Sequence, residues 1–331
     1  MKQLVEDFAQ QLRDAIDIGE KATVTFSGAE YNNVVMAGMG ASGIGCNLMQ
    51  AYVADKLHVP VVVSKSYTIP AFVGPGTLFI ASSFSGNTEE IIYSVRAAMN
   101  SGARVAFLTA GGELLRIARE EGIPYLLIPQ EPRHPRACLG YSLVAMLYLL
   151  HYSGLLDDTF KTELRQSVAL LEEQAGIIKV QASALANAFH TKMPVLYVSD
   201  ALEPVALRFQ QQLNENAKQL CHVNTFPEMN YNEIVGWQNP GDIYQQLAVL
   251  LIKTAYDHPR VQLRMSLSKK LFESKVPDVL EIEAQGATFL EQALYLIHLF
   301  DWVSVYLAKL SNVNPEDIDN IDYLKGKLSR A

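Results

Sequence analysis

Residues 77–96 read TLFIASSFSGNTEEIIYSVR, and this stretch decides the fold of the chain. An apolar, β-prone run at 78–81 passes through a hydroxyl-rich segment at 82–88. Apolar residues then recur at positions 91, 92, 95 and 98, which is the spacing of one helix face. The stretch therefore predicts a strand, a tight turn and a helix.

The predicted turn offers short hydroxyl side chains at Ser83, Ser85 and Thr88 beside Gly86, whose backbone can approach a ligand closely. Hydroxyls together with the free N–H groups of a helix start can hold an anion without any cationic side chain. We interpret the turn as a phosphate site. Ordinary N-capping, with two glutamates favouring the helix dipole, is the alternative for any single hydroxyl here.

The composition is that of a soluble globular protein, with 49% hydrophobic and 19% charged residues in a chain of 331. This length predicts two domains or one large one. A formal net charge of −8 and the absence of a basic cluster argue against nucleic acid as a partner. A phosphate must therefore be attracted locally, by aimed dipoles and one or two cations.

Targeting and metal-binding patterns are missing from the sequence. The three cysteines, Cys46, Cys138 and Cys221, lie far apart without metal-ligand spacing, as reduced thiols of a cytosolic protein do. Residues 1–21 mix acids and bases, unlike a signal or transit peptide. No window is expected to reach the roughly 18 apolar residues of a membrane span. We expect a cytoplasmic protein that uses no membrane, metal or cofactor.

A second glycine-rich turn, GMGASGIG at 38–45, follows a predicted strand at 34–37 and opens a predicted helix. It fits the dinucleotide-binding fingerprint only loosely. The next strand also ends in Lys65 and not in the acid that would hold a ribose. We favour a second small-residue turn, with Ser42 opposite the serine turn.

Apolar runs at 59–63, 77–83, 104–109 and 124–129 alternate with helical stretches. Such continuous runs are typical of strands buried on both faces, and hence of a parallel sheet covered by helices. Both special turns follow strand C-termini, where ligands bind in open α/β sheets.

The second half of the chain repeats this alternation. Strands are predicted at 194–200, 221–227, 247–255 and 278–284, and helices at 202–218, 259–274 and 287–310. Residues 158–190 read as a helix pair or as one bent helix. We therefore expect an α/β fold of two doubly wound parallel-sheet domains, 1–153 and 154–331, with a ligand between them.

The block SSFSGNTEE, preceded by GMGASGIG, resembles the sugar isomerase (SIS) domain family, in which this turn binds the phosphate of a phosphosugar. Four further motifs resemble the bifunctional phosphoglucose/phosphomannose isomerases: PRACLGYSL (135–143), QLNENAK (212–218), FPEMNYNEIVGW (226–237) and NPEDIDNIDYLKGKL (314–328). The resemblance covers nearly the whole chain in consistent order. It implies two SIS domains in each protomer, a working homodimer, and no cofactor or metal.

The resemblance also implies roles for individual residues. The phosphate ligands would be Ser42, Ser83, Ser85 and Thr88. Glu215 in NEN would be the catalytic base, Arg136 would steady the enediolate, and Lys325 would help to open the ring. A carboxylate can carry a proton across one face of an enediol, and a cation offsets charge developing on the oxygens.

Without the resemblance these three side chains have plain interpretations. Glu215 reads as a solvated helix carboxylate, and Arg136 either caps a site or faces solvent. Lys325 reads as a lysine that favours the dipole at the end of a helix.

The chain departs from the family pattern at Tyr231. The family usually has a histidine here, in NHNE, contributed by the neighbouring protomer for ring opening, whereas this chain reads NYNE. A histidine ionises near pH 6.5 and a tyrosine near 10, so a tyrosine is a poor base at neutral pH. His222 lies nearby in sequence, but its apolar run CHVNTF predicts a sheet residue.

The sequence thus predicts an aldose–ketose isomerase that interconverts glucose 6-phosphate, and also mannose 6-phosphate, with fructose 6-phosphate through a cis-enediol. Three alternatives stay open: a phosphosugar-binding protein that has lost catalysis, an isomerase for another phosphosugar, and a lyase acting on an etherified sugar acid.

Overall fold

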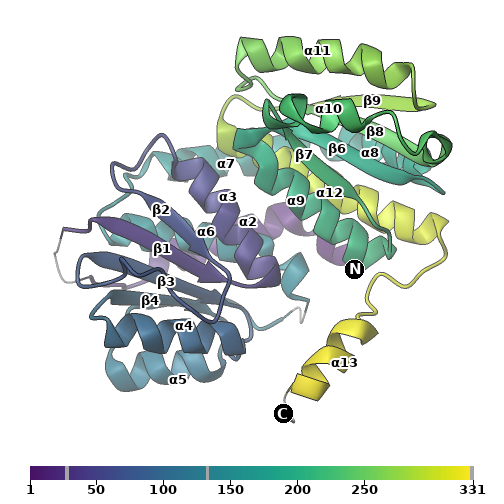
Figure 1. Ribbon diagram of the computed structural model, residues 1–331. Helices are drawn as coiled ribbons and strands as arrows, with labels where there is room; N and C mark the ends of the chain where they lie inside the picture. Colours follow the sequence, from purple (N-terminus) through teal and green to yellow (C-terminus); the bar gives the residue numbers. More distant parts are fainter. Residues whose placement is uncertain (27–29, 132–133, 329–331) are drawn as a thin grey trace. The chain divides into compact units, whose positions relative to one another are not determined.

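The computed structural model describes residues 1–26, 30–131 and 134–328, which form two compact units (Figure 1). The N-terminal unit comprises Glu6–Glu172 and Thr288–Glu291. The C-terminal unit comprises Met1–Val5, Glu173–Ala287 and Gln292–Ala331. Each unit has its own parallel sheet with helices on both faces, so the predicted α/β fold of two doubly wound domains is confirmed.

The sheet of the N-terminal unit has the strand order β2-β1-β3-β4-β5. Its strands are β1 (Asn33–Gly38), β2 (Val61–Ser64), β3 (Thr77–Ser83), β4 (Arg104–Thr109) and β5 (Tyr125–Leu127). Its helices are α2 (Phe8–Lys21), α3 (Gly40–Val53), α4 (Glu89–Asn100), α5 (Gly112–Glu121), α6 (Leu139–Tyr152) and α7 (Thr159–Glu173), with the short 3-10 helix η1 (Pro135–Ala137).

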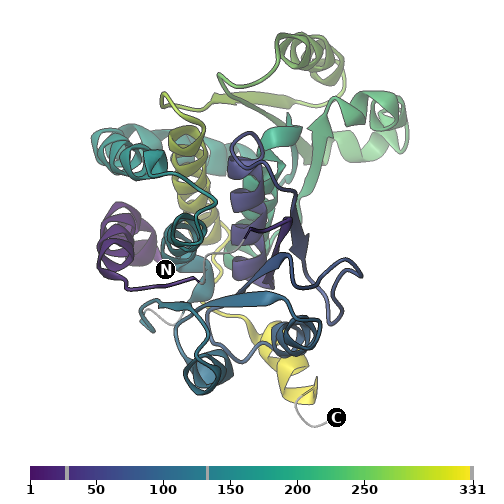
Figure 2. The same cartoon turned by 90° about the vertical axis from the view of Figure 1, so that its left-hand side faces the viewer.

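Strand β3 is central to this sheet, and every one of its residues is buried. Phe79 and Ala81 point to the face covered by α4 and α5, where they join a cluster with Phe107 and Ile91. The alternate residues point to the opposite face, because successive side chains of a strand alternate. Figures 1 and 2 show α3 and α6 on that second face. Burial on both faces explains the continuous apolar runs.

The sheet of the C-terminal unit has the strand order β7-β6-β8-β9. Its strands are β6 (Met193–Ser199), β7 (His222–Phe226), β8 (Leu247–Lys253) and β9 (Asp278–Glu283). Its longer helices are α8 (Ala175–Phe189), α9 (Glu203–Gln212), α11 (Pro259–Glu273), α12 (Phe289–Leu310) and α13 (Asp319–Leu328). Its shorter ones are α1 (Lys2–Glu6), α10 (Glu233–Gly236), η2 (Asp200–Leu202), η3 (Leu213–Ala217), η4 (Glu228–Tyr231) and η5 (Gly241–Gln246).

The two faces of this second sheet are covered by different helices (Figure 1). On one face Tyr197 of β6 stacks on Phe272 of α11, with ring centroids 5.0 Å apart. On the other face α9 packs on α12, where the rings of Phe209 and Phe300 stack at 4.2 Å.

Helix α12 corrects one expectation. By length and composition it is apolar enough to cross a membrane, so the statement that no window reaches that limit is wrong. In the structure 83% of that window is buried inside the protein, as expected for the core helix of a soluble fold.

The division into units falls between Glu172 and Glu173, whereas the sequence placed it near residue 153. Helix α7 belongs to the N-terminal unit because its side chains pack there. Phe160 meets the ring of Tyr148 edge-on at 5.1 Å, and Arg165 lies 3.2 Å from Glu20 of α2.

Candidate active site

The hydroxyl turn lies where β3 ends in the N-terminal unit. Ser83 Oγ and Thr88 Oγ1 are 2.8 Å apart, and the backbone N–H of Gly86 donates to Ser83 Oγ at 3.2 Å. Ser85 stands exposed at the tip of the turn, where its Oγ accepts from the N–H of Asn87 at 3.2 Å. The structure therefore brings Ser83, Ser85 and Thr88 together in one small loop.

The loop after β4 fixes the shape of this turn. The N–H of Ala110 donates to the carbonyl of Phe84, and that of Leu114 donates to the carbonyl of Gly86, both at 3.0 Å. Gly86 has φ +68, and a Cβ there would come within 1.8 Å of the Gly111 carbonyl oxygen. Any residue with a side chain would clash or be strained here, so this turn requires glycine.

The helix starts beside the turn are left open to a ligand. Thr88 is the N-cap residue of α4, yet within the described chain its side chain makes no capping bond and contacts Ser83 instead. Met39 likewise gives α3 no side-chain cap among these residues. The N-capping alternative is therefore wrong for Thr88, and both helices present N–H groups that suit an anion.

Ser42 lies in the first turn of α3, directly after β1. Its backbone packs so closely on Gly38 that a Cβ at Gly38 would come 2.8 Å from the carbonyl carbon of Ser42. Gly38 pairs with Ser82 of β3, so the glycine-rich turn and the hydroxyl turn leave neighbouring strands at the same sheet edge.

Arg136 occupies the 3-10 helix η1 and is only 3% exposed. The alternative that it faces solvent is therefore wrong. A buried guanidinium keeps its charge in proteins, so Arg136 is a fixed cation in the N-terminal unit.

Glu215 lies in the C-terminal unit, in a segment that departs from the expected single helix over 202–218. The chain there forms the 3-10 helix η2, the α-helix α9 and the π-helical turn η3. π-Helical turns are rare and often occur at functional sites. Glu215 is half-buried and lines a cavity of about 690 Å³ together with residues 313–314 and 317–321. It is not a freely solvated helix carboxylate.

Lys218 ends this π-helical turn in the left-handed conformation, with φ +57. Its Nζ donates to the carbonyl of Glu215 at 2.6 Å and to the carbonyl of Asp317 at 2.8 Å. One side chain thus joins the Glu215 segment to the segment that leads into α13. Lys325 lies exposed in the last turn of α13, a position that also suits the helix dipole.

A buried polar network lies beneath the π-helical turn. Asp301 of α12 accepts from Arg208 at 3.1 and 3.2 Å and from Gln212 Nε2 at 2.8 Å. Asn216 Nδ2 donates to Ser304 Oγ at 2.9 Å. All five side chains are nearly inaccessible to solvent. The buried bond from Asn216 to Ser304 therefore holds the backbone next to Glu215 against α12.

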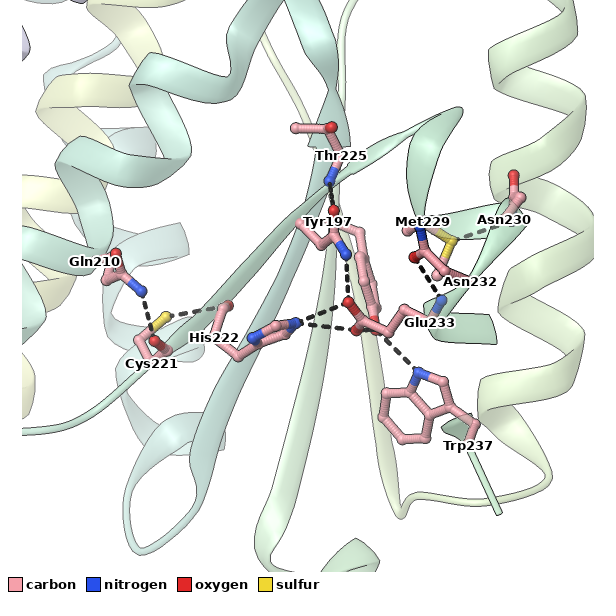
Figure 3. Close-up of polar contacts among 11 residues, drawn as sticks. Tyr197, Gln210, Cys221, His222, Thr225, Met229, Asn230, Asn232, Glu233 and Trp237 are labelled. Carbon is pink, nitrogen blue, oxygen red and sulfur yellow. Dashed lines mark hydrogen bonds and ion pairs between the residues drawn. The ribbon is translucent and has the colours of Figure 1, made fainter. Parts of the chain in front are cut away.

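Tyr231 ends η4 and is largely exposed. The Arg264 guanidinium lies 5.4 Å from its ring centroid, and Nη2 donates to the Tyr231 hydroxyl at 3.4 Å. Two residues further on, Glu233 folds back onto the sheet (Figure 3). It accepts from Tyr197 at 2.5 Å, from His222 Nε2 at 3.0 Å, and from Asn224.

These contacts shift the pKa values of the pair. Burial alone would raise the pKa of Glu233, but the hydrogen bonds from His222, Asn224 and Tyr197 outweigh it and lower that pKa to about 2. The hydrogen bond to Glu233 raises the pKa of His222, and burial opposes this. His222 is the first residue of β7, as predicted, and its Nε2 is held by Glu233.

Tyr231 and Glu215 of one chain lie on opposite faces of the C-terminal sheet. The segment that carries Tyr231 packs with α11: Met229 joins the cluster that contains Met265, and Asn230 Nδ2 donates to Ser268 Oγ at 3.1 Å. Glu215 follows α9, which covers the other face (Figure 1). The two side chains of one chain are therefore separated by the sheet.

Sequence reasoning missed Lys218, Glu233 and the anchor beneath Glu215. Glu233 was visible only as the last letter of the NYNE motif. Asn216 and Lys218 belong to QLNENAK, but nothing local in that motif shows a partner 88 residues away on α12 or 99 residues away in the segment before α13.

Two parallel α/β units, the first with an uncapped hydroxyl turn at its carboxyl edge, define a protein built of two SIS domains. The family model described as the bacterial phospho-glucose isomerase C-terminal SIS domain matches residues 178–328. Among solved structures, the C-terminal domain of glucosamine-fructose-6-phosphate aminotransferase from Francisella tularensis shares this fold. It has a TM-score of 0.75 and 13% identity, with 95% of this chain and 97% of that chain covered.

Two curated relatives are named bifunctional phosphoglucose/phosphomannose isomerase. The protein of Caldicellulosiruptor bescii is 34% identical, with 99% of each chain covered. That of Aquifex aeolicus is 33% identical, with 91% of each chain covered. The chain belongs to the bifunctional phosphoglucose/phosphomannose isomerase family.

Proposed function

We propose that this chain is a sugar-phosphate isomerase that interconverts glucose 6-phosphate, and also mannose 6-phosphate, with fructose 6-phosphate through a cis-enediol. Its relatives over nearly the full chain carry the names of both activities. The observation that carries the proposal is the position of Glu215, a half-buried carboxylate on an anchored π-helical turn beside a cavity of about 690 Å³.

The substrate phosphate binds at the hydroxyl turn. The proposed ligands are Ser42, Ser83, Ser85 and Thr88. Two observations support this assignment: the loop after β4 holds the turn by backbone hydrogen bonds, and within the described chain neither α3 nor α4 has a side-chain cap. A phosphate would accept bonds from hydroxyls and helix N–H groups at once.

Glu215 moves the proton. It takes the proton from C2 of the open-chain aldose and returns it to C1 on the same face of the enediol, while the hydroxyl proton passes from the C2 oxygen to the C1 oxygen, so the carboxylate is regenerated. Charge develops on the two oxygens during this transfer. The guanidinium of Arg136 offsets that charge, and Lys325 assists ring opening.

The working protein is a cytoplasmic homodimer, with Tyr231 supplied to each site by the partner protomer. The positions of Tyr231 and Glu215 on opposite faces of one sheet support this arrangement. The exposed segment around Tyr231 supports it as well, since Val235 is also largely exposed. An exposed apolar segment of this kind is typical of an interface.

Isotope exchange with a Glu215→Gln variant tests the proposal. The wild-type protein, given fructose 6-phosphate in heavy water, should incorporate deuterium at the carbon that accepts the proton. The variant should lose isomerisation and exchange by a factor on the order of 10² to 10⁴ while it still binds substrate. Asp200→Asn, a change of another acid of the C-terminal unit, is the control. Exchange at the wild-type rate in Glu215→Gln would show that another group is the base.

A further inference from the structure

We propose that Lys65 binds the substrate phosphate dianion, as the cation that completes the hydroxyl turn. This inference rests on the proposed function, because it concerns the same phosphate. A dianion approaching a chain of net charge −8 needs local positive charge, and the turn itself is built of neutral side chains.

Lys65 follows the last residue of β2 at the same sheet edge as both turns. In the register of the sheet Ser64 of β2 pairs with Ala37 of β1, and Gly38 of β1 pairs with Ser82 of β3. The start of α3 therefore has Lys65 on one side and the hydroxyl turn on the other. Three successive strand ends converge there, where open α/β sheets bind ligands.

The lysine side chain lies against the first turn of α3. A Cβ added at Gly43 would come within 3.2 Å of Lys65 Cε and 2.6 Å of the Gly38 carbonyl oxygen. The missing side chain at Gly43 thus leaves the space that the lysine stem occupies. Cys46 lies one helical turn after Gly43. Burial raises the pKa of its thiol, and the positive charge of Lys65 opposes that shift, so Lys65 acts electrostatically on the interior of α3.

Positive charge from two sources lies at this place. The N-terminal end of a helix carries a partial positive charge, and Lys65 adds the full charge of an ammonium group beside it. A phosphate bound between Lys65 and the first N–H groups of α3 would be attracted by both.

The loop that carries Lys65 is tied to the helix that closes the hydroxyl turn. Ser94 Oγ of α4 donates to the carbonyl of Ser66 at 2.7 Å, and the rings of Tyr67 and Tyr93 meet edge-on at 5.9 Å. Helix α4 begins directly after Thr88. The residues directly after Lys65 are thus bonded to the helix that begins after Thr88.

Inorganic phosphate is the probe for the test, titrated by calorimetry into the full-length wild-type protein and into Lys65→Met, Lys65→Arg and Ser85→Ala. Lys65→Met should weaken phosphate binding about tenfold or more, and Lys65→Arg should retain most of the affinity. The dissociation constant of Lys65→Met should also rise less steeply with salt than that of the wild type. Lys21→Met removes a lysine that is 79% exposed at the end of α2, and this control should bind phosphate normally.

The outcomes separate this inference from the proposed function. If Ser85→Ala weakens phosphate binding but Lys65→Met stays within twofold of wild type with an unchanged salt slope, Lys65 is not a ligand and the hydroxyl turn stands. If neither variant affects phosphate, the location of the phosphate site is wrong. Deuterium exchange lost in Glu215→Gln would still support the isomerase in both cases.

Discussion

Asn216 of the π-helical turn donates its side-chain amide to Ser304 Oγ of α12 at 2.9 Å, and Ser304 in turn donates to the carbonyl of Asp301 at 2.7 Å. The residue next to Glu215 is therefore bonded to the most buried helix of the C-terminal unit. The Glu215 side chain faces the cavity while its backbone is held from the opposite side.

Ser304→Ala should lower both stability and turnover. It removes the hydrogen bond between Ser304 and the buried Asn216 amide, which costs about 1–3 kcal/mol of the free energy of unfolding, measured by urea titration. With the anchor weakened, kcat should fall while KM stays near the wild-type value. Ser167→Ala is the matched control, since Ser167 Oγ donates to the carbonyl of Glu163, in the preceding turn of its own helix, at 2.7 Å. Equal stability in the two variants would contradict the anchoring role.

Ser85→Ala should weaken binding of sugar phosphates about tenfold or more. It removes a hydrogen bond to a charged oxygen, worth roughly 1.5–3 kcal/mol. Ser101→Ala, at the far end of α4, is the control, because Ser101 Oγ donates to the carbonyl of Ala97 in its own helix. Calorimetry that finds unchanged affinity in a folded Ser85→Ala protein would remove the hydroxyl turn from the site.

Tyr231→His should raise turnover on cyclic glucose 6-phosphate. A histidine can accept and donate a proton at neutral pH, and a tyrosine is a poor base there, so ring opening should limit the wild-type enzyme. Substrate that is already open should react at nearly the same rate in both proteins. Coupled assays with the cyclic and the open-chain substrate would measure both rates. Equal or lower turnover of the variant on every hexose 6-phosphate would mean that another residue opens the ring.

The His222–Glu233 pair should stabilise the protein over a defined pH window. The pKa of His222 is raised above its ordinary 6.5, so the contribution of the charged histidine is fully present below 6.5 and is lost as pH rises through the raised value. The pKa of Glu233 is lowered from 4.5 to about 2, so its contribution is present above 4.5 and is lost as pH falls toward 2. The pair is therefore most stabilising between about pH 4.5 and 6.5.

Thermal melting of His222→Gln across this range provides the measurement. The deficit in Tm relative to wild type should be largest near pH 5.5 and should shrink toward pH 8.5. His58→Gln, at an exposed position of the N-terminal unit, is the control. A deficit that does not change with pH would mean that the pair acts through packing alone.

Activity of mixed dimers tests whether each site is shared between protomers. The Glu215→Gln and Tyr231→Ala proteins should each be impaired alone. A mixture of the two, unfolded and refolded together, should regain activity. In the mixed dimer one site then has both wild-type residues and the other has neither. Light scattering at micromolar concentration should show a dimer. A monomer that remains active would exclude the shared site.

The strands and the hydroxyl turn could be predicted because their causes are local. Residues 78–81 are apolar because β3 is buried on both faces, and Gly86 marks a turn that no other residue can make. The π-helical turn could not be predicted, because the choice between α and π bonding at 213–217 depends on Ser304 and Asp317, far away in sequence.

The burial of Arg136 and the boundary between the two units could not be predicted from the sequence either. The surroundings of Arg136 come from folding, so its sequence neighbours could not show that it is buried. The predicted boundary near 153 differs from the division into compact units, because Gly154 punctuates the chain without ending the packing of α7 on α2 and α6. Met1 is grouped with the C-terminal unit, where its amino group pairs with Glu316.

The apolarity of α12 has a consequence for synthesis of the chain. All four strands of the C-terminal sheet precede α12, so a nascent chain builds that sheet while one of its faces still awaits its covering helix. Until it docks, α12 has the hydropathy of a transmembrane segment. An intermediate in which α12 has not yet docked thus has two complementary apolar surfaces, and chaperones that hold such surfaces apart should govern the yield of this protein.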